Sequence, residues 1–273
     1  MKTVFMFPQE LIDRFVDEVA GGKPTYHISP GVQRELRSCS LAARCFLSRS
    51  QRHLLAHARL FIFRGGIQSK RLRKLREILE TNDALRQCFI HLTIILQPMN
   101  TDDEDVELEF HDGNLPFVMN MLAELRHLDI CTNNEAIEWD SLSQGIKTAL
   151  GNTRFTSPHL SSLLLGGILI SPHDLVYTWK SIKEITLRCV GMNTGEGTSQ
   201  NASMEEFRLE KVRISGHEFP LHLALQNSQI LGGLRQFKFS SVEVCPCVIR
   251  QIWNVIHIAS KSLVDLDLTE CFG

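Results

Sequence analysis

The sequence predicts an α/β protein in two parts. Residues 1–60 form a helical module, and residues 61–273 form a chain of units that each combine a parallel strand with a flanking helix. Two observations predict this organisation. Amphipathic helical patterns open the chain, and a leucine-rich spacing then recurs to its end. A strand followed by a helix, repeated, gives a parallel sheet with helices packed on it.

The first helix of the module is predicted to open at Pro8, because proline is well suited to the first helical position. It ends at Gly21-Gly22. A second helix follows a polar loop. A module of this length cannot build a large core, so we expect it to complete its apolar surface against a partner or a neighbouring domain. The two apolar faces are Leu11, Ile12, Phe15, Val16 and Val19, and Leu36, Cys39, Ser40, Ala43, Phe46 and Leu47.

Two blocks of the module, residues 7–19 (FPQELIDRFVDEV) and 36–46 (LRSCSLAARCF), resemble an F-box. They are most similar to the F-box-like proteins that are numerous in mushroom-forming fungi. The resemblance implies docking on the Skp-family adaptor of a cullin–RING ubiquitin ligase. An ordinary helical-hairpin core is the alternative interpretation. The positions that match the docking face of the family are Pro8, Leu11, Ile12, Leu36, Ser40, Leu41 and Arg44.

After the module, the spacing Leu-x-x-Leu-x-Leu recurs with apolar substitutions. The last two positions of each triplet share one face of a strand, and residues three and five further on are expected to turn the chain back inward. The middle units, at Leu163, Ile185 and Phe207, are 22 residues apart. The triplets are Leu125, Leu128, Ile130; Leu160, Leu163, Leu165; Ile182, Ile185, Leu187; Met204, Phe207, Leu209; Leu234, Phe237, Phe239; and Leu263, Leu266, Leu268, with Phe89, Leu92, Ile94 as a weaker copy.

These units resemble a degenerate leucine-rich-repeat solenoid, in which stacking of neighbours makes one continuous core. The alternative is an ordinary α/β domain in which the leucine spacing is coincidental. The chain ends at the edge of a repeat, which predicts a truncated sequence or an end covered by a partner. The helices expected between strands are Leu115 to Leu125, Leu142 to Leu150, Leu175 to Ser181, Leu221 to Leu231 and Val248 to Ala259.

The function that these patterns predict is that of a substrate-receptor subunit of a Skp–cullin–F-box ligase, which is not itself an enzyme. The alternatives are an adaptor-independent interaction scaffold, with the first helices as a solenoid cap, and an enzyme with a diffuse pocket. The predicted target-binding residues stand between the repeat leucines. They are Arg126, Asp129, Lys183, Glu184, Glu206, Arg208, Arg235 and Lys238, with His127, Thr186, Glu205 and Gln236 beside them.

Composition argues against a nucleic-acid-binding or membrane protein and indicates a cellular compartment. The net charge of −2 gives no reason to expect nucleic-acid or anionic-membrane binding. No apolar stretch is long enough to span a bilayer. The eight cysteines are scattered among apolar patterns, which favours free thiols in a reducing compartment, hence the cytoplasm or nucleus.

No cofactor or metal is expected, because the chain lacks phosphate-binding, nucleophile-elbow and zinc-site motifs. His53 and His57 are four residues apart and are interpreted as surface or second-layer histidines of one helix. Cys245-Pro246-Cys247 lacks a second cysteine pair at zinc-site spacing.

Two charged runs remain. Residues 70–76 (KRLRKLR) are basic and lie on a helix expected to run to about Leu85, and residues 102–109 (DDEDVELE) are acidic. The favoured interpretation is solvated surface. The alternative is that one run touches the substrate; the basic run is too short and too poor in aromatics to indicate nucleic-acid binding.

Overall fold

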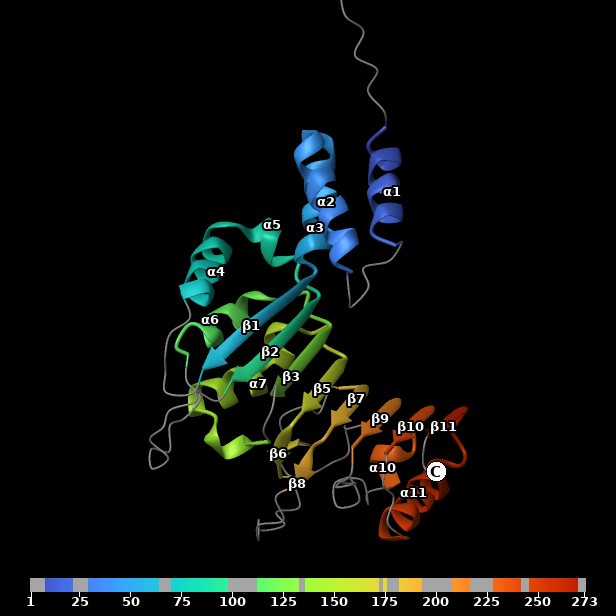
Figure 1. Ribbon diagram of the computed structural model, residues 1–273. Coiled ribbons are helices and arrows are strands. Elements are labelled where there is room, and N and C mark those ends of the chain that lie inside the picture. Colours follow the sequence, from blue (N-terminus) through green and yellow to red (C-terminus); the bar gives the residue numbers. More distant parts are fainter. Residues whose placement is uncertain are drawn as a thin grey trace, which may run out of the picture.

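The computed structural model describes residues 8–21, 29–63, 70–97, 112–132, 136–171, 174–175, 182–192, 208–216, 228–241 and 246–269 (Figure 1). Helices α1 (Gln9–Val19), α2 (Pro30–Ala42) and α3 (Arg44–Leu55) open the chain. Strands and helices then alternate, which confirms the predicted α/β class. The helices are α4 (Lys70–Thr81), α5 (Asp83–Arg86), α6 (Leu115–Met121), η1 (Trp139–Ser141), α7 (Gln144–Thr156), α10 (Ser228–Leu231) and α11 (Pro246–Ala259).

The main sheet has eight strands in the order β1-β2-β3-β5-β7-β9-β10-β11, so each strand pairs with the next one along the chain in this sheet. Every pairing is parallel. Parallel neighbours require a crossover segment between them, and the helices and loops supply it. The strands are β1 (His57–Phe63), β2 (His91–Gln97), β3 (His127–Thr132), β5 (Ser162–Gly166), β7 (Glu184–Arg188), β9 (Lys211–Ser215), β10 (Gln236–Ser240) and β11 (Asp265–Thr269).

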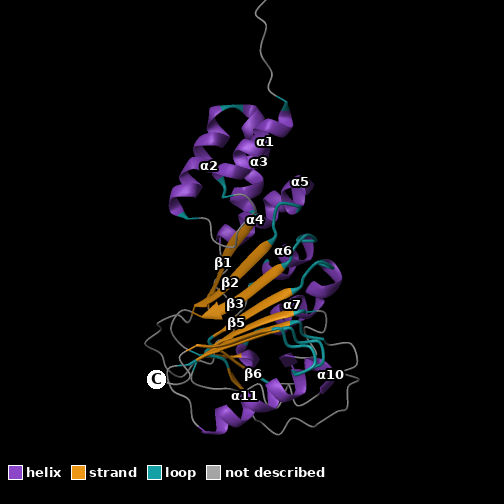
Figure 2. Ribbon diagram, turned by 90° about the vertical axis from the view of Figure 1, so that its right-hand side faces the viewer, coloured by secondary structure: helices purple, strands orange, loops and turns teal. Residues whose placement is uncertain are grey.

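The register aligns the repeated apolar residues in straight rows across the sheet. One row contains Leu92, Leu128, Leu163, Ile185, Val212, Phe237 and Leu266. All but Leu266 are buried. Because alternate residues of a strand point to opposite faces, these rows form the face that packs on helices. Figure 2 shows α6 and α7 together on one side of the strands, and buried residues of α4, α6, α7 and α11 join the same core.

A second sheet of three short parallel strands, β4 (Ile137–Glu138), β6 (Ile168–Ile170) and β8 (Gly191–Met192), follows the carboxyl ends of the main strands. Buried Ile168 and Ile170 confirm the predicted inward turn. The chain turns with positive φ at Gly167, Cys189 and Gly216. At Gly216 a Cβ atom would lie 3.0 Å from the backbone nitrogen of Cys189, so only glycine fits.

The predicted strand register of the fourth unit is wrong. Val212, not Phe207, pairs with Ile185, and the strand is β9. Met204 and Phe207 lie outside the described residues. Leu209 is buried just before the strand, so Leu209, Val212 and Ile214 carry the repeat spacing in this unit. The sequence offers both phases, and only the pairing with neighbouring strands selects one of them.

The second predicted helix is divided in two. Ala43 adopts an extended backbone, with φ −158° and ψ 151°, and separates α2 from α3. The predicted basic helix also stops earlier, at Thr81, where the Asn82 side chain accepts a hydrogen bond from the Leu85 N–H and starts α5. In the part of the chain that the structure describes, no helix is long and apolar enough to cross a membrane.

The first three helices have a small core of their own. Val16, Ala20 and Leu36 are buried there, with Phe46 and Leu54 packed against them. This core is separate from that of the sheet. Leu54 contacts the small core and the next residue, Leu55, contacts the large one. The separation lies at the end of α3, immediately before β1.

Candidate functional site

An ion-pair network fixes α1 against α3. Arg49 donates from Nε and Nη2 to the two carboxylate oxygens of Asp17, at 2.6 Å each, and His53 Nε2 lies 2.7 Å from Asp17 Oδ1. The hydrogen bond from Arg49 is the main cause that lowers the pKa of Asp17 to about 2. A bidentate arginine–carboxylate pair sets orientation as well as energy, so this contact fixes how α1 sits on α3.

The prediction that His53 and His57 share one helix face is wrong. His53 is only 2% exposed and contacts Asp17, while His57 is not on the helix at all but opens β1. The spacing of four residues suggested a shared helix face. The helix ends at Leu55, between them, so the two side chains belong to different regions.

The three-helix unit exposes several of the predicted docking residues. Leu41 is 87% exposed and Leu11 is 54% exposed. Pro8 and Arg44 are also exposed, Ile12 is half-buried, and the Ser40 hydroxyl donates to the Arg37 carbonyl at 2.7 Å.

Leu36 differs from this set, because it is fully buried in the small core and holds the helices together. Its side chain is therefore not on the accessible surface of the unit.

One contact brings distant parts of this set to the same end of the unit. Gln9 Nε2, next to Pro8 at the start of α1, donates to the Cys45 carbonyl at the start of α3, at 3.1 Å. Cys45 follows Arg44 directly, and Leu41 stands two residues before the break at Ala43. Pro8, Leu41 and Arg44 therefore gather where α1 and α3 begin and α2 ends.

Two exposed apolar residues of the unit were not among the predicted docking positions. Phe15 is 54% exposed and Leu47 is 38% exposed. Phe15 lies four residues after Leu11, on the same face of α1, and its ring is 6.0 Å from that of Phe46. The i, i+4 spacing from Leu11 is the sequence signal that could have identified Phe15.

The predicted target-binding residues fall in two places. Asp129, Glu184 and Lys238 lie on strands β3, β7 and β10, beside the neighbours His127, Thr186 and Gln236. Arg126, Lys183 and Arg235 lie just before a strand, and the carbonyl of each accepts two N–H groups from the next unit. Arg208 precedes β9 and is exposed, whereas Glu205 and Glu206 lie outside the described residues.

Ion pairs connect neighbouring strands along this surface. Lys183 lies 3.1 Å from Glu210, Lys211 lies 3.8 Å from Glu184, and Lys238 lies 2.9 Å from Asp267. Lys211 and Arg213 were missed because the register of the fourth unit was misplaced. In the described chain, Arg188 and Arg213 are exposed and have no ion-pair partner on this face.

A row of three histidines crosses the other end of the same face. His57, His91 and His127 are register partners on β1, β2 and β3. The rings of His57 and His91 stack with centroids 4.1 Å apart, and the ring of His127 meets that of His91 edge-on at 5.8 Å. Only the pairing of three strands brings them together, so their sequence separation hides the cluster.

Asp129 and Thr93 bind this row. Asp129 Oδ2 lies 2.7 Å from His91 Nε2, and the Thr93 hydroxyl lies 2.9 Å from His57 Nε2. Burial is the main cause that lowers the pKa of His127 to about 4, and His91 and Arg126 act in the same direction. His127 is therefore neutral at neutral pH.

The geometry gives little support to metal or thiol chemistry in the described residues. No group of three or more histidine, cysteine or acidic side chains there is arranged to hold a metal ion. Burial raises the pKa of the Cys131 thiol, which lowers its reactivity as a nucleophile. Cys245 and Cys271 lie outside the described residues.

A scan against models of protein families and a search of curated proteins each found no match to this chain.

Proposed function

We propose that the chain is a substrate-receptor subunit of a Skp–cullin–F-box ubiquitin ligase. The first three helices dock the adaptor, and a solenoid of leucine-rich-repeat-like units binds the protein to be ubiquitinated. The observation that carries the proposal is a three-helix unit with its own small core and large apolar side chains left in solvent. The chemistry takes place elsewhere in the complex, and this subunit contributes proximity.

The exposed side chains support docking for an energetic reason. Fully burying an apolar side chain contributes about 1.5–3 kcal/mol. Leu41 gains little of this within the chain, and Leu11 and Phe15, each 54% exposed, gain only part of it. The Asp17–Arg49 pair meanwhile fixes the helices that carry them. An ordered unit with exposed apolar residues loses little conformational entropy on binding.

The open face of the sheet suits a target protein. Its rows mix charged, hydroxyl and histidine side chains, as a selective polar surface requires. Arg188 and Arg213 are exposed there. The in-register parallel strands present these groups on a rigid base.

The test is co-purification with the Skp-family adaptor from the same organism. Wild type is compared with Leu41→Asp, and the matched control is Val264→Asp, because Val264 is 84% exposed but lies next to β11. We expect stoichiometric binding by wild type and by the control, and its loss in Leu41→Asp. Binding that survives Leu41→Asp at unchanged affinity, or no binding by folded wild type, contradicts the proposal.

The second candidate is an adaptor-independent scaffold in which the helices cap the repeats. The position of the three helices supports this alternative, because they lie at the β1 end of the sheet (Figure 1). The exposure of Leu41 and the separate small core favour docking over capping. A cap that shields the first strand would share its core.

A further inference from the structure

The outward face of α4 is a cationic surface that adaptor docking and target binding leave unused. Lys70, Arg71, Arg73 and Lys74 are all exposed. Among the residues that the structure describes, none of these four side chains has an ion-pair or hydrogen-bond partner. Four cations within five residues are therefore held close together in solvent.

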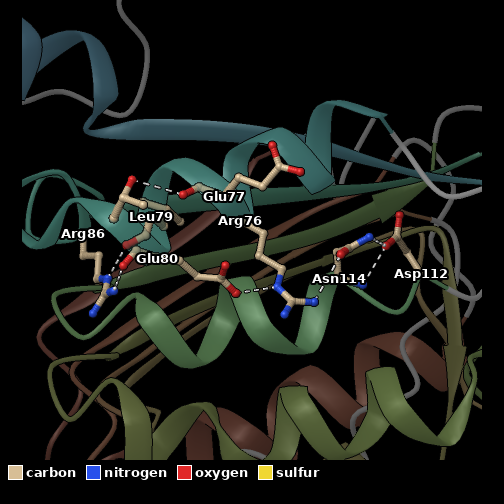
Figure 3. Close-up of polar contacts among 8 residues, drawn as sticks. Arg76, Glu77, Leu79, Glu80, Arg86, Asp112 and Asn114 are labelled. Atoms are coloured by element: carbon tan, nitrogen blue, oxygen red, sulfur yellow. Dashed lines mark hydrogen bonds and ion pairs between the residues drawn. The ribbon is translucent and has the colours of Figure 1, made fainter.

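Other cations of the same region are bound to the protein itself (Figure 3). Arg76 Nε lies 2.7 Å from Glu80, and its guanidinium stacks 3.9 Å above the Phe117 ring of α6. Arg86 donates from Nη2 to the Glu80 carbonyl at 3.0 Å and pairs with Asp83. These arginines hold α4, α5 and α6 together, a role that the four exposed cations do not share.

Helix geometry spreads the four cations over the side away from the core. At about 100° per residue, Lys70 and Lys74 point opposite to buried Leu72 and Leu79. Arg73 and Arg71 lie on either side of them. Lys70, Arg71 and Arg73 stand in the first turn of α4, which contains no acidic residue. Their positive charges are therefore repelled by the positive N-terminal end of the helix dipole. These cations therefore destabilise the start of α4. Residues that break a local stability rule in this way are expected mainly at functional sites.

We propose that this face of α4, defined by Lys70, Arg71, Arg73 and Lys74, binds an acidic segment of a partner protein. Charge complementarity selects an anionic partner. Ile78, which is 49% exposed, lies four residues after Lys74 and seven after Arg71 on the same side of α4 and adds an apolar contact suited to a peptide. Arg76 covers one face of the Phe117 ring, so that face cannot stack with a base, as single-stranded nucleic acid would require.

The experiment measures binding of a fluorescein-labelled (Glu-Glu-Gly-Leu)4 peptide to the full chain by anisotropy at low and physiological salt. The variant is Arg73→Glu with Lys74→Glu. Its matched control is Arg250→Glu with Lys261→Glu, two exposed positions near the other end of the chain with the same change in charge. The comparison probes are the same peptide with glutamine for glutamate, a single-stranded RNA 12-mer and phosphatidylserine vesicles.

We expect the α4 variant to weaken binding of the acidic peptide by at least about tenfold, and the control by less than about twofold. Salt should weaken wild-type binding. The neutral double variant Lys70→Gln, Lys74→Gln replaces the first if that one fails to fold. Absence of peptide binding by wild type overturns the proposal, as does tighter α4-dependent binding of RNA or vesicles. Adaptor co-purification does not depend on this face, so the two proposals fail separately.

Discussion

The three N-terminal helices and the parallel sheet differ in how much of their apolar surface they bury. The sheet buries its repeated leucines in one large core, and β2 is buried almost throughout. The helices bury little more than Val16, Ala20 and Leu36 and leave Phe15 and Leu41 in solvent. The sheet therefore buries most of its apolar surface within the described chain, except at β11, where Leu266 is 44% exposed. The helical unit leaves large apolar side chains exposed, as the proposed docking requires.

The largest effect should follow truncation in the sheet core. Phe237 is fully buried in the middle of the main core, so Phe237→Ala should lower the free energy of unfolding by about 3–5 kcal/mol. Leu36→Ala, in the small core, should cost about 2–3 kcal/mol and loosen only α1–α3. Denaturant unfolding gives the energies, and hydrogen exchange shows where protection is lost. If Leu36→Ala also reduces protection of β1–β3, the two regions share one core and the cap interpretation gains support.

A smaller effect should come from the network that orients α1. Asp17→Asn removes the charge that Arg49 and His53 contact, and we expect a loss of about 1–2 kcal/mol after allowance for solvent screening. The folded pKa of Asp17 is about 2, below the usual 3.8. This stabilisation is therefore fully present above pH 4 and lost as the pH falls toward 2. A difference between wild type and variant that stays constant over this range, measured by urea unfolding, would contradict the assigned pKa.

The smallest effect concerns the histidine row on the sheet. The folded pKa of His127, about 4, lies below the usual 6.5, so the unfolded chain takes up the proton first as the pH falls. Stability should decrease between pH 6.5 and 4 for this reason. His127→Gln should therefore gain about 1 kcal/mol relative to wild type between pH 7 and pH 5. Exposed His159, changed to Gln, is the control. An identical pH dependence of stability in wild type and His127→Gln would contradict the lowered pKa of His127.

Much of the sheet could be predicted from the sequence because its signal is local and repeated. A leucine triplet such as Leu160, Leu163 and Leu165 places a strand through alternation alone. The strand of the fourth unit was predicted wrongly because two alignments of the repeat spacing fit the sequence, one through Phe207 and one through Val212. Pairing with β7 selects the alignment through Val212. Local pattern cannot show which phase a neighbouring strand will accept.

The candidate sites were less predictable, because contacts between distant residues make them. Leu41 stands on α2 five residues after buried Leu36, about 140° around the helix, and the packing of α2 against α1 and α3 leaves that side in solvent. The row of His57, His91 and His127 depends on the register of three strands. The burial of His53 depends on Asp17, 36 residues earlier.

The most direct test of the contrast between the two regions is hydrogen exchange of the full chain with and without the Skp-family adaptor. We predict that the adaptor protects α1, the end of α2 and the start of α3, where Leu11, Leu41 and Arg44 lie, and leaves the sheet unchanged. Protection confined to the sheet, or none at saturating adaptor, would contradict the account.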